Sequence, residues 1–164
     1  MKDLVLLTGS PRTGKSTAFT SLVSSHGNHP SVFYVLSRET RESGQRTGFE
    51  VVTSDWKQPV VFAKRGEDGK YQFDGNVWND IADQLRKNAD KTILLDEIGP
   101  MQLNCTEFRD SLFAILCMST LSMFATIALK ADPGGFIDKI KQYPFAILYE
   151  LSMQNRNVVL NTLA

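Results

Sequence analysis

Residues 9 to 16 read GSPRTGKS and follow a short apolar run, Leu4 to Leu7, with only Thr8 between them. The stretch fits the pattern G-x-x-x-x-G-K-[ST] at every fixed position. The apolar run before it predicts a buried strand, and Ala18 to Val23 after it carry apolar residues at helical spacing. A glycine-framed turn between a strand and a helix directs its backbone N–H groups toward one point, which suits a phosphate group. The stretch therefore predicts a phosphate-binding loop.

The loop predicts a site for a nucleoside triphosphate with Mg²⁺. We expect Lys15 to reach the β- and γ-phosphates, and the hydroxyl of Ser16 to ligate the metal ion. The expected nucleotide-binding residues are Gly9, Ser10, Pro11, Arg12, Thr13, Gly14, Lys15, Ser16 and Thr17. The alternative is a Gly/Pro-rich turn whose lysine is only solvated.

A second motif supplies the carboxylates that such a site needs. Residues 92 to 97 read TILLDE, an apolar β-run that ends in two acids, as in a Walker B motif. We expect Asp96 to hold Mg²⁺ or its waters, and Glu97 to act as the general base that deprotonates the attacking water. The alternative is a pair of solvated acids at the end of a strand.

Bulk properties limit the other classes of protein. The chain has 164 residues with 18 basic and 18 acidic side chains, so it is expected to form a single domain over residues 1–164 without a nucleic-acid-binding charge field. No stretch is expected to span a membrane. The spacing of the two cysteines, Cys105 and Cys117, argues against a disulfide if both lie on one helix. We expect a reducing compartment, the cytoplasm; the sequence does not indicate an oligomeric state.

The chain alternates predicted strands and helices around a β-rich insertion at residues 37–74. We expect this insertion to form antiparallel hairpins at one edge of a mostly parallel sheet, with helices on both faces. Ligands of such sheets bind at the carboxyl ends of the strands. Other predicted elements are a strand at Val32–Leu36, a helix with Asp132-Pro133 as its cap and first turn, a strand at Phe145–Leu148 and a closing helix at Met153–Leu163.

Three further motifs resemble the cancer-related nucleoside-triphosphatase family, a group of small P-loop enzymes. Residues 38 to 49, RETRESGQRTGF, resemble its signature E-x-R-x-x-G-x-R-x-G-F; residues 96 to 101, DEIGPM, resemble D-E-I-G-x-M; and residues 154 to 157, QNRN, are similar to E-N-R-[DN]. Their order and spacing hold from Gly9 to Arg156. The resemblance implies a P-loop NTPase with a RecA-like sheet, Mg²⁺-dependent hydrolysis of ATP, GTP or other triphosphates, and loose base selectivity.

Two positions depart from the family pattern. Gln102 is neutral where the family has an acid, so it cannot act as a base or as a charged metal ligand. Arg12 stands where the family commonly has a small residue. Lys15, Ser16 and the two acids are unaffected by these departures.

Four arginines are candidates for contacts with the triphosphate. Arg156 is expected to stabilise charge in the transition state beside the catalytic pair Lys15 and Glu97. Arg38, Arg41 and Arg46 could form a lid, or they could only make ion pairs with the acids between them.

Two other functions use the same parts. A P-loop kinase for a small molecule, nucleoside or nucleotide would bind an acceptor and exclude water, and a nucleotide-dependent switch would hydrolyse slowly to reset a binding surface. The acid pair and the resemblance favour the hydrolase.

Overall fold

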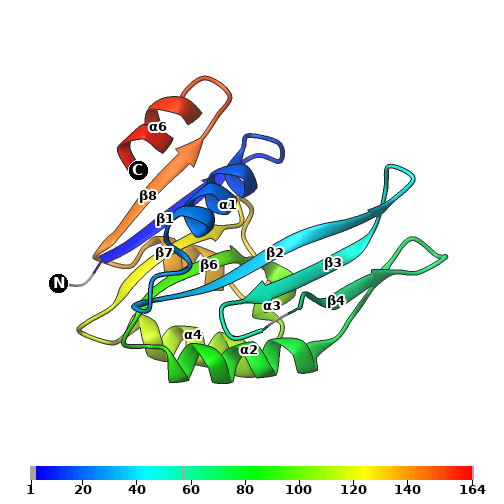
Figure 1. The fold of residues 1–164 in the computed structure, drawn as a ribbon, viewed down its shortest axis with the longest axis horizontal. Helices are drawn as coiled ribbons and strands as arrows, with labels where there is room; N and C mark the ends of the chain where they lie inside the picture. The colour runs from blue at the N-terminus through cyan, green and yellow to red at the C-terminus, as the bar shows by residue number, and fades with distance from the viewer. Residues whose placement is uncertain (1–2, 57, 164) are drawn as a thin grey trace.

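The computed structural model describes residues 3–56 and 58–163. Eight strands are present: β1 (Asp3–Gly9), β2 (Val32–Glu42), β3 (Gln45–Thr53), β4 (Val60–Arg65), β5 (Tyr71–Phe73), β6 (Thr92–Ile98), β7 (Ser122–Ile127) and β8 (Ala146–Leu151). They form one sheet in the order β5-β4-β3-β2-β6-β7-β1-β8 (Figure 1). The neighbouring pairs β2–β6, β6–β7, β7–β1 and β1–β8 are parallel. The pairs β2–β3, β3–β4 and β4–β5 are antiparallel.

Helices cover the two faces of this sheet unequally. They are α1 (Lys15–His26), α2 (Gly75–Lys87), α3 (Pro100–Leu103), α4 (Thr106–Leu116), α5 (Phe136–Lys141) and α6 (Arg156–Leu163). In Figure 1, α1 lies on one face and α2 and α4 lie together on the other. The larger hydrophobic core is on the α2–α4 side, where Trp78 packs edge-on against Phe62 and Phe108. A smaller cluster around Phe19 lies under α1.

The β-rich insertion forms antiparallel strands at one edge, as the sequence predicts. The β2–β3 hairpin turns at Ser43 and Gly44, which both have positive φ, at 48° and 80°. Positive φ at both central residues is the geometry of the two-residue hairpin turns whose twist matches that of the strands. The hairpin, together with β4 beside it, projects beyond the parallel part of the sheet (Figure 1).

Several boundaries differ from those predicted. β2 continues to Glu42 instead of ending at Leu36, because its pairing with β3 extends the backbone ladder into the polar segment. α6 starts at Arg156 rather than Met153. Asn155 explains the delay, since its side chain bonds the backbone of Ser152 and Glu150 in a turn before the helix.

The helix predicted at Asp132-Pro133 is also displaced. α5 begins only at Phe136, after Gly135 with φ 67°. Asp132 accepts hydrogen bonds from the backbone N–H groups of Gly134 and Ile137. Asp132 therefore closes a turn and also caps α5, but it lies four residues before the first residue of the helix and not directly before it, as the sequence pattern predicts.

The cysteines flank one helix. Cys105 precedes α4 and Cys117 follows it, and neither forms a disulfide. Across the described part of the chain, no helix has the length and apolar content needed to cross a membrane.

Candidate active site

Strand order brings the two predicted motifs to the same edge of the sheet. β1 leads into the loop of residues 9–14, and β6 carries Asp96 and Glu97 at its end. β7 lies between these strands and is parallel to both. The carboxyl ends of all three strands therefore meet at one edge, where ligands of α/β sheets bind.

The loop depends on glycine at two places. Gly9 has φ 145°, and a Cβ there would lie 2.5 Å from the backbone oxygen of Leu151 on β8. Gly14 has φ 100° and directly precedes α1. Arg12 also has positive φ, at 66°, and its side chain is exposed. Thr13 ties the loop together, since its hydroxyl donates to the carbonyl oxygen of Ser10 at 2.8 Å.

The side chain of Lys15 folds back over the loop that precedes it and is held there by hydrogen bonds. Its Nζ donates to the carbonyl oxygens of Gly9 at 2.6 Å and Ser10 at 2.9 Å. Partial burial lowers the pKa of Lys15, and the nearby charges of Glu97 and Asp96 oppose this shift. The ammonium from α1 and both acids from β6 are therefore close enough to interact electrostatically, although they are about 80 residues apart in the sequence.

Asp96 is only 4% exposed. Its Oδ1 accepts a hydrogen bond from the hydroxyl of Thr126 on β7. Burial raises the pKa of Asp96 to about 7, helped by the charge of Glu97, while the bond from Thr126, the charge of Lys15 and the backbone of Ser37 act in the opposite direction. A buried carboxylate of this kind favours a cation beside it.

Glu97 faces the same site from the next position of β6. Burial raises the pKa of its carboxyl group, and the charge of Lys15 lowers it. A carboxyl group with a raised pKa is suited to accept a proton near neutral pH. The predicted role of Glu97 as general base stays a prediction, and its raised pKa is compatible with that role.

The oxygen donors available here suit Mg²⁺. The exposed hydroxyl of Ser16 lies on the first turn of α1, and the buried carboxylate of Asp96 lies on β6. Mg²⁺ prefers oxygen ligands and is commonly bound through one or two carboxylates together with substrate phosphates and waters. These two residues would hold the ion.

Arg156 lies beside the loop. It is the first residue of α6, and its Cδ is 3.7 Å from the position that a Cβ of Gly14 would occupy. The chain thus returns to the phosphate loop at its C-terminal end and brings one cation there.

The hairpin arginines have partners of their own. Glu39 forms ion pairs with both Arg41, at 2.6 Å, and Arg46. The guanidinium of Arg46 also lies over the ring of Phe49. Arg38 is exposed on the same hairpin. The predicted lid role of the three arginines stays a prediction, and in this structure two of them are held by Glu39.

Three hydroxyl residues near the loop and the acid pair were missed by the sequence analysis. Thr126 bonds Asp96, while Thr8 Oγ1 and Ser37 Oγ are buried with no hydrogen-bond partner among the described residues. Thr8 directly precedes the loop, and Ser37 follows the residue that pairs with Asp96. The available signal was a serine or threonine at the end of an apolar β-run.

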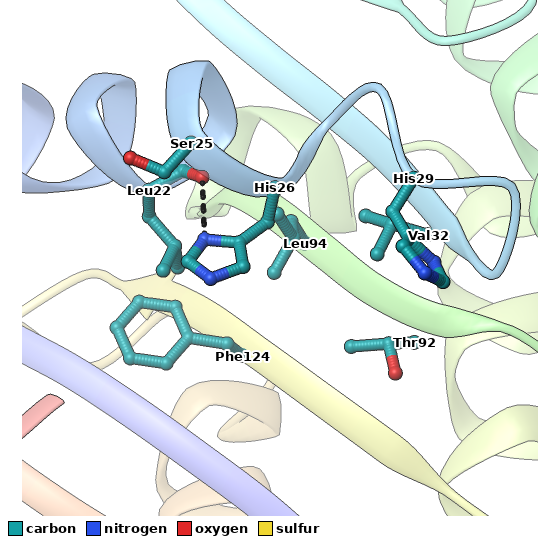
Figure 2. Close-up of a pocket in the computed structure, with 8 residues that line it drawn as sticks. All are labelled: Leu22, Ser25, His26, His29, Val32, Thr92, Leu94 and Phe124. Carbon is teal, nitrogen blue, oxygen red and sulfur yellow. Dashed lines mark hydrogen bonds between the residues drawn. The ribbon is translucent and has the colours of Figure 1, made fainter. Parts of the chain in front are cut away.

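A pocket of about 420 Å³ lies elsewhere, between α1 and the sheet. Figure 2 shows His26 and Phe124 at its wall, with the ring Nδ1 of His26 3.3 Å from the carbonyl oxygen of Leu22. Val32 and Thr92, which also line it, are the first residues of β2 and β6. The pocket is therefore at the amino ends of the strands, away from the phosphate loop.

Comparison with known proteins gives a consistent result. A family model described as NTPase matches residues 4–164. A nucleoside-triphosphatase THEP1 of Thermotoga sp. (strain RQ2) is 32% identical, over 96% of this chain and 91% of its own length. The cancer-related nucleoside-triphosphatase homolog of Bos taurus is 26% identical, over 95% of this chain and 92% of its own length.

A solved structure supports the same assignment. The crystal structure of THEP1 from Aquifex aeolicus aligns with this structure at a TM-score of 0.78 and 26% sequence identity. The alignment includes 100% of this chain and 97% of the THEP1 chain. The predicted resemblance and the predicted P-loop α/β fold are both confirmed. The chain therefore belongs to the NTPase family and is an enzyme of the nucleoside-triphosphatase type.

Proposed function

We propose that the protein hydrolyses nucleoside triphosphates to diphosphate and phosphate with Mg²⁺, and that Glu97 activates the attacking water. One observation carries this proposal: β1 and β6 are both parallel to β7, so that Lys15, directly after the loop that follows β1, and Glu97, at the end of β6, lie at the same edge of the sheet, where each charge favours the charged form of the other. A phosphate bound by the loop would thus lie near a carboxyl group suited to proton transfer.

The loop residues do the binding. Backbone N–H groups of residues 9–17, except Pro11, which has none, would surround the phosphates, and Lys15 would leave its contacts with Gly9 and Ser10 to reach the β- and γ-phosphates. Ser16 and Asp96 would hold Mg²⁺, which neutralises charge on the phosphate oxygens. These contacts address the triphosphate rather than the base, which supports loose selectivity among ATP, GTP and other triphosphates.

The chemical step is a displacement at the γ-phosphorus. The oxygen of a water molecule forms a bond to phosphorus while the bond from phosphorus to the β–γ bridging oxygen breaks. One proton of that water passes to the carboxylate of Glu97, and the electron pair of the broken bond stays on the diphosphate. Arg156, beside the loop, would stabilise the charge that develops on the phosphate oxygens.

The hairpin and the compartment belong to the same proposal. Release of Arg41 and Arg46 from Glu39 would let them, together with Arg38, close over the triphosphate. We place the protein in the cytoplasm, where free thiols such as Cys105 and Cys117 stay reduced.

A phosphate-release assay with a matched pair of variants tests the proposal. Purified protein with Mg²⁺ and ATP or GTP is expected to release phosphate with no added acceptor. Glu97→Gln removes the base but keeps the shape, so nucleotide affinity should persist while turnover falls by about a hundredfold or more. Glu107→Gln, an exposed acid on α4, is the control and should change neither.

Other results would point to other functions. Phosphate transfer that requires an added acceptor would identify a kinase. Tight binding with only slow hydrolysis in the parent protein would identify a switch, and unchanged turnover in Glu97→Gln would exclude Glu97 as the base.

A further inference from the structure

Gln102 shares one small space with Glu97. A Cβ built on Gly99 would lie 2.9 Å from Oε1 of Gln102 and 3.0 Å from Oε1 of Glu97. Both oxygens therefore border the same space over Gly99, one from the end of β6 and the other from α3. Because Gly99 has no Cβ, both oxygens can approach its backbone closely.

The amide of Gln102 is a polar group beside Glu97 in a mostly buried position. Its residue is only 7% exposed, and a buried amide is costly unless its polar atoms are hydrogen-bonded. An ionised carboxylate oxygen, the form of Glu97 that acts as a base, and an amide oxygen both accept hydrogen bonds and cannot bond each other. A water molecule has two hydrogens and can donate one to each.

We propose that Oε1 of Gln102 is a second acceptor for the attacking water, so that Gln102 and Glu97 together orient this water toward the γ-phosphate. This inference rests on the proposed hydrolysis. With both hydrogens directed to the two side chains, the lone pairs of the water oxygen are free to point at phosphorus. Orienting the nucleophile in this way lowers the entropic cost of reaching the transition state.

The two side chains have different tasks in the step. Glu97 takes the proton that the water loses as its oxygen bonds to phosphorus. Gln102 is neutral and takes no proton, so the second hydrogen stays on the transferred oxygen and leaves with the phosphate product. The amide acts only through the hydrogen bond that it accepts.

Two substitutions at Gln102 separate this role from a structural one. Gln102→Met keeps the length of the side chain but has only a weak thioether acceptor, and should lower kcat by about tenfold, as for one lost hydrogen bond to the nucleophile, with little change in KM. Gln102→Glu keeps an acceptor oxygen at the same reach and should retain kcat within about threefold of the parent. Asn104→Met removes an exposed amide just after the same helix and is the control.

Gly99→Ala gives an independent test that does not depend on Gln102 variants folding. Gly99 has φ −128° and ψ 171°, which alanine can adopt, so its methyl would enter the shared space without backbone strain. We expect kcat to fall while nucleotide affinity, measured by calorimetry, is kept.

The outcomes are distinguishable from those of the Glu97 test. Unchanged kcat in Gln102→Met or in Gly99→Ala would overturn the inference even if Glu97→Gln is inactive. So would a Gln102→Glu variant as slow as Gln102→Met, or an effect on KM alone. An active Glu97→Gln variant would instead refute the proposed general base.

Discussion

The hydroxyl of Thr126 on β7 donates a hydrogen bond to Oδ1 of Asp96 on β6, and both residues are almost fully buried. This bond favours the charged form of Asp96, while burial favours the neutral form and raises its pKa. β7 separates the strand of the phosphate loop from the strand of the acid pair. It therefore contributes a group that favours the charged form of Asp96, which is the form that the proposed Mg²⁺ site requires.

Thr126→Val should weaken both the fold and the use of Mg²⁺. Valine has the shape of threonine but leaves the buried Oδ1 of Asp96 without this donor, which costs about 1–3 kcal/mol of unfolding free energy. The Mg²⁺ concentration that gives half-maximal activity should rise. Urea unfolding and a Mg²⁺ titration of phosphate release measure the two effects.

A matched control lies at the other end of the same strand pair. Thr92→Val removes a hydroxyl of β6 that donates to Ser122 of β7 at 3.3 Å. This bond is partly exposed and far from the acids, so the Mg²⁺ dependence should not move. Equal shifts in Thr126→Val and Thr92→Val would show that the Asp96 bond has no special role.

Asp96 should also give the nucleotide-free protein a distinctive pH dependence. Its pKa is about 7 in the folded protein, against about 3.9 for an unperturbed aspartate. Between these values the folded state keeps a proton that the unfolded state has lost, so the free energy of unfolding falls as pH rises through this window. One proton accounts for at most about 1.4 kcal/mol per pH unit.

Urea midpoints at several pH values between 4 and 8, measured with EDTA, test this dependence. Asp96→Asn cannot titrate and should lose this part of the slope. If the parent and Asp96→Asn show parallel pH profiles, Asp96 does not carry a raised pKa in the folded protein.

The sequence predicted the parts of the site that are local in the chain. Gly9, Gly14 and Lys15 belong to one short loop motif, and the acids of β6 end a single apolar run. Each motif could therefore be recognised from the sequence without knowledge of the three-dimensional structure. The link from Thr126 to Asp96 depends on which strands are neighbours, and periodicity does not reveal that order.

The missed boundaries have the same kind of cause. β2 extends to Glu42 because another strand pairs with it, although its own residues there are polar. α5 starts late because Gly135 takes a left-handed conformation inside a turn organised by Asp132. In both cases an interaction with another part of the chain, the pairing with β3 or the hydrogen bonds to Asp132, helps to decide the backbone conformation.

Gly9→Ala should abolish nucleotide binding, and Gly44→Ala should not. A methyl group on Gly9 would collide with the backbone of Leu151, and φ 145° disfavours alanine, so the loop must change shape at a cost of about 2 kcal/mol or more. Gly44 also has positive φ, at 80°, but has nothing within 4 Å of its Cβ position.

Comparing Gly9→Ala with Gly44→Ala separates the effect of local backbone strain on stability from the loss of nucleotide binding. Gly44→Ala should cost only about 1 kcal/mol at the hairpin turn and leave affinity for a magnesium nucleotide unchanged. Calorimetric binding and urea unfolding of both variants provide the comparison. Retained binding in Gly9→Ala would mean that the loop tolerates another backbone path.

Arg156→Ala should affect the rate more than the binding of substrate. The side chain packs against Gly14, so its guanidinium is expected to lie near the γ-phosphate, where charge develops as the bond to the bridging oxygen breaks. Loss of this cation should lower kcat on the order of a hundredfold with a smaller change in KM. Arg86→Ala removes an arginine of α2, on the sheet face opposite α1, and should leave kcat unchanged. A loss confined to KM in steady-state kinetics would instead mean that Arg156 only binds the ground state.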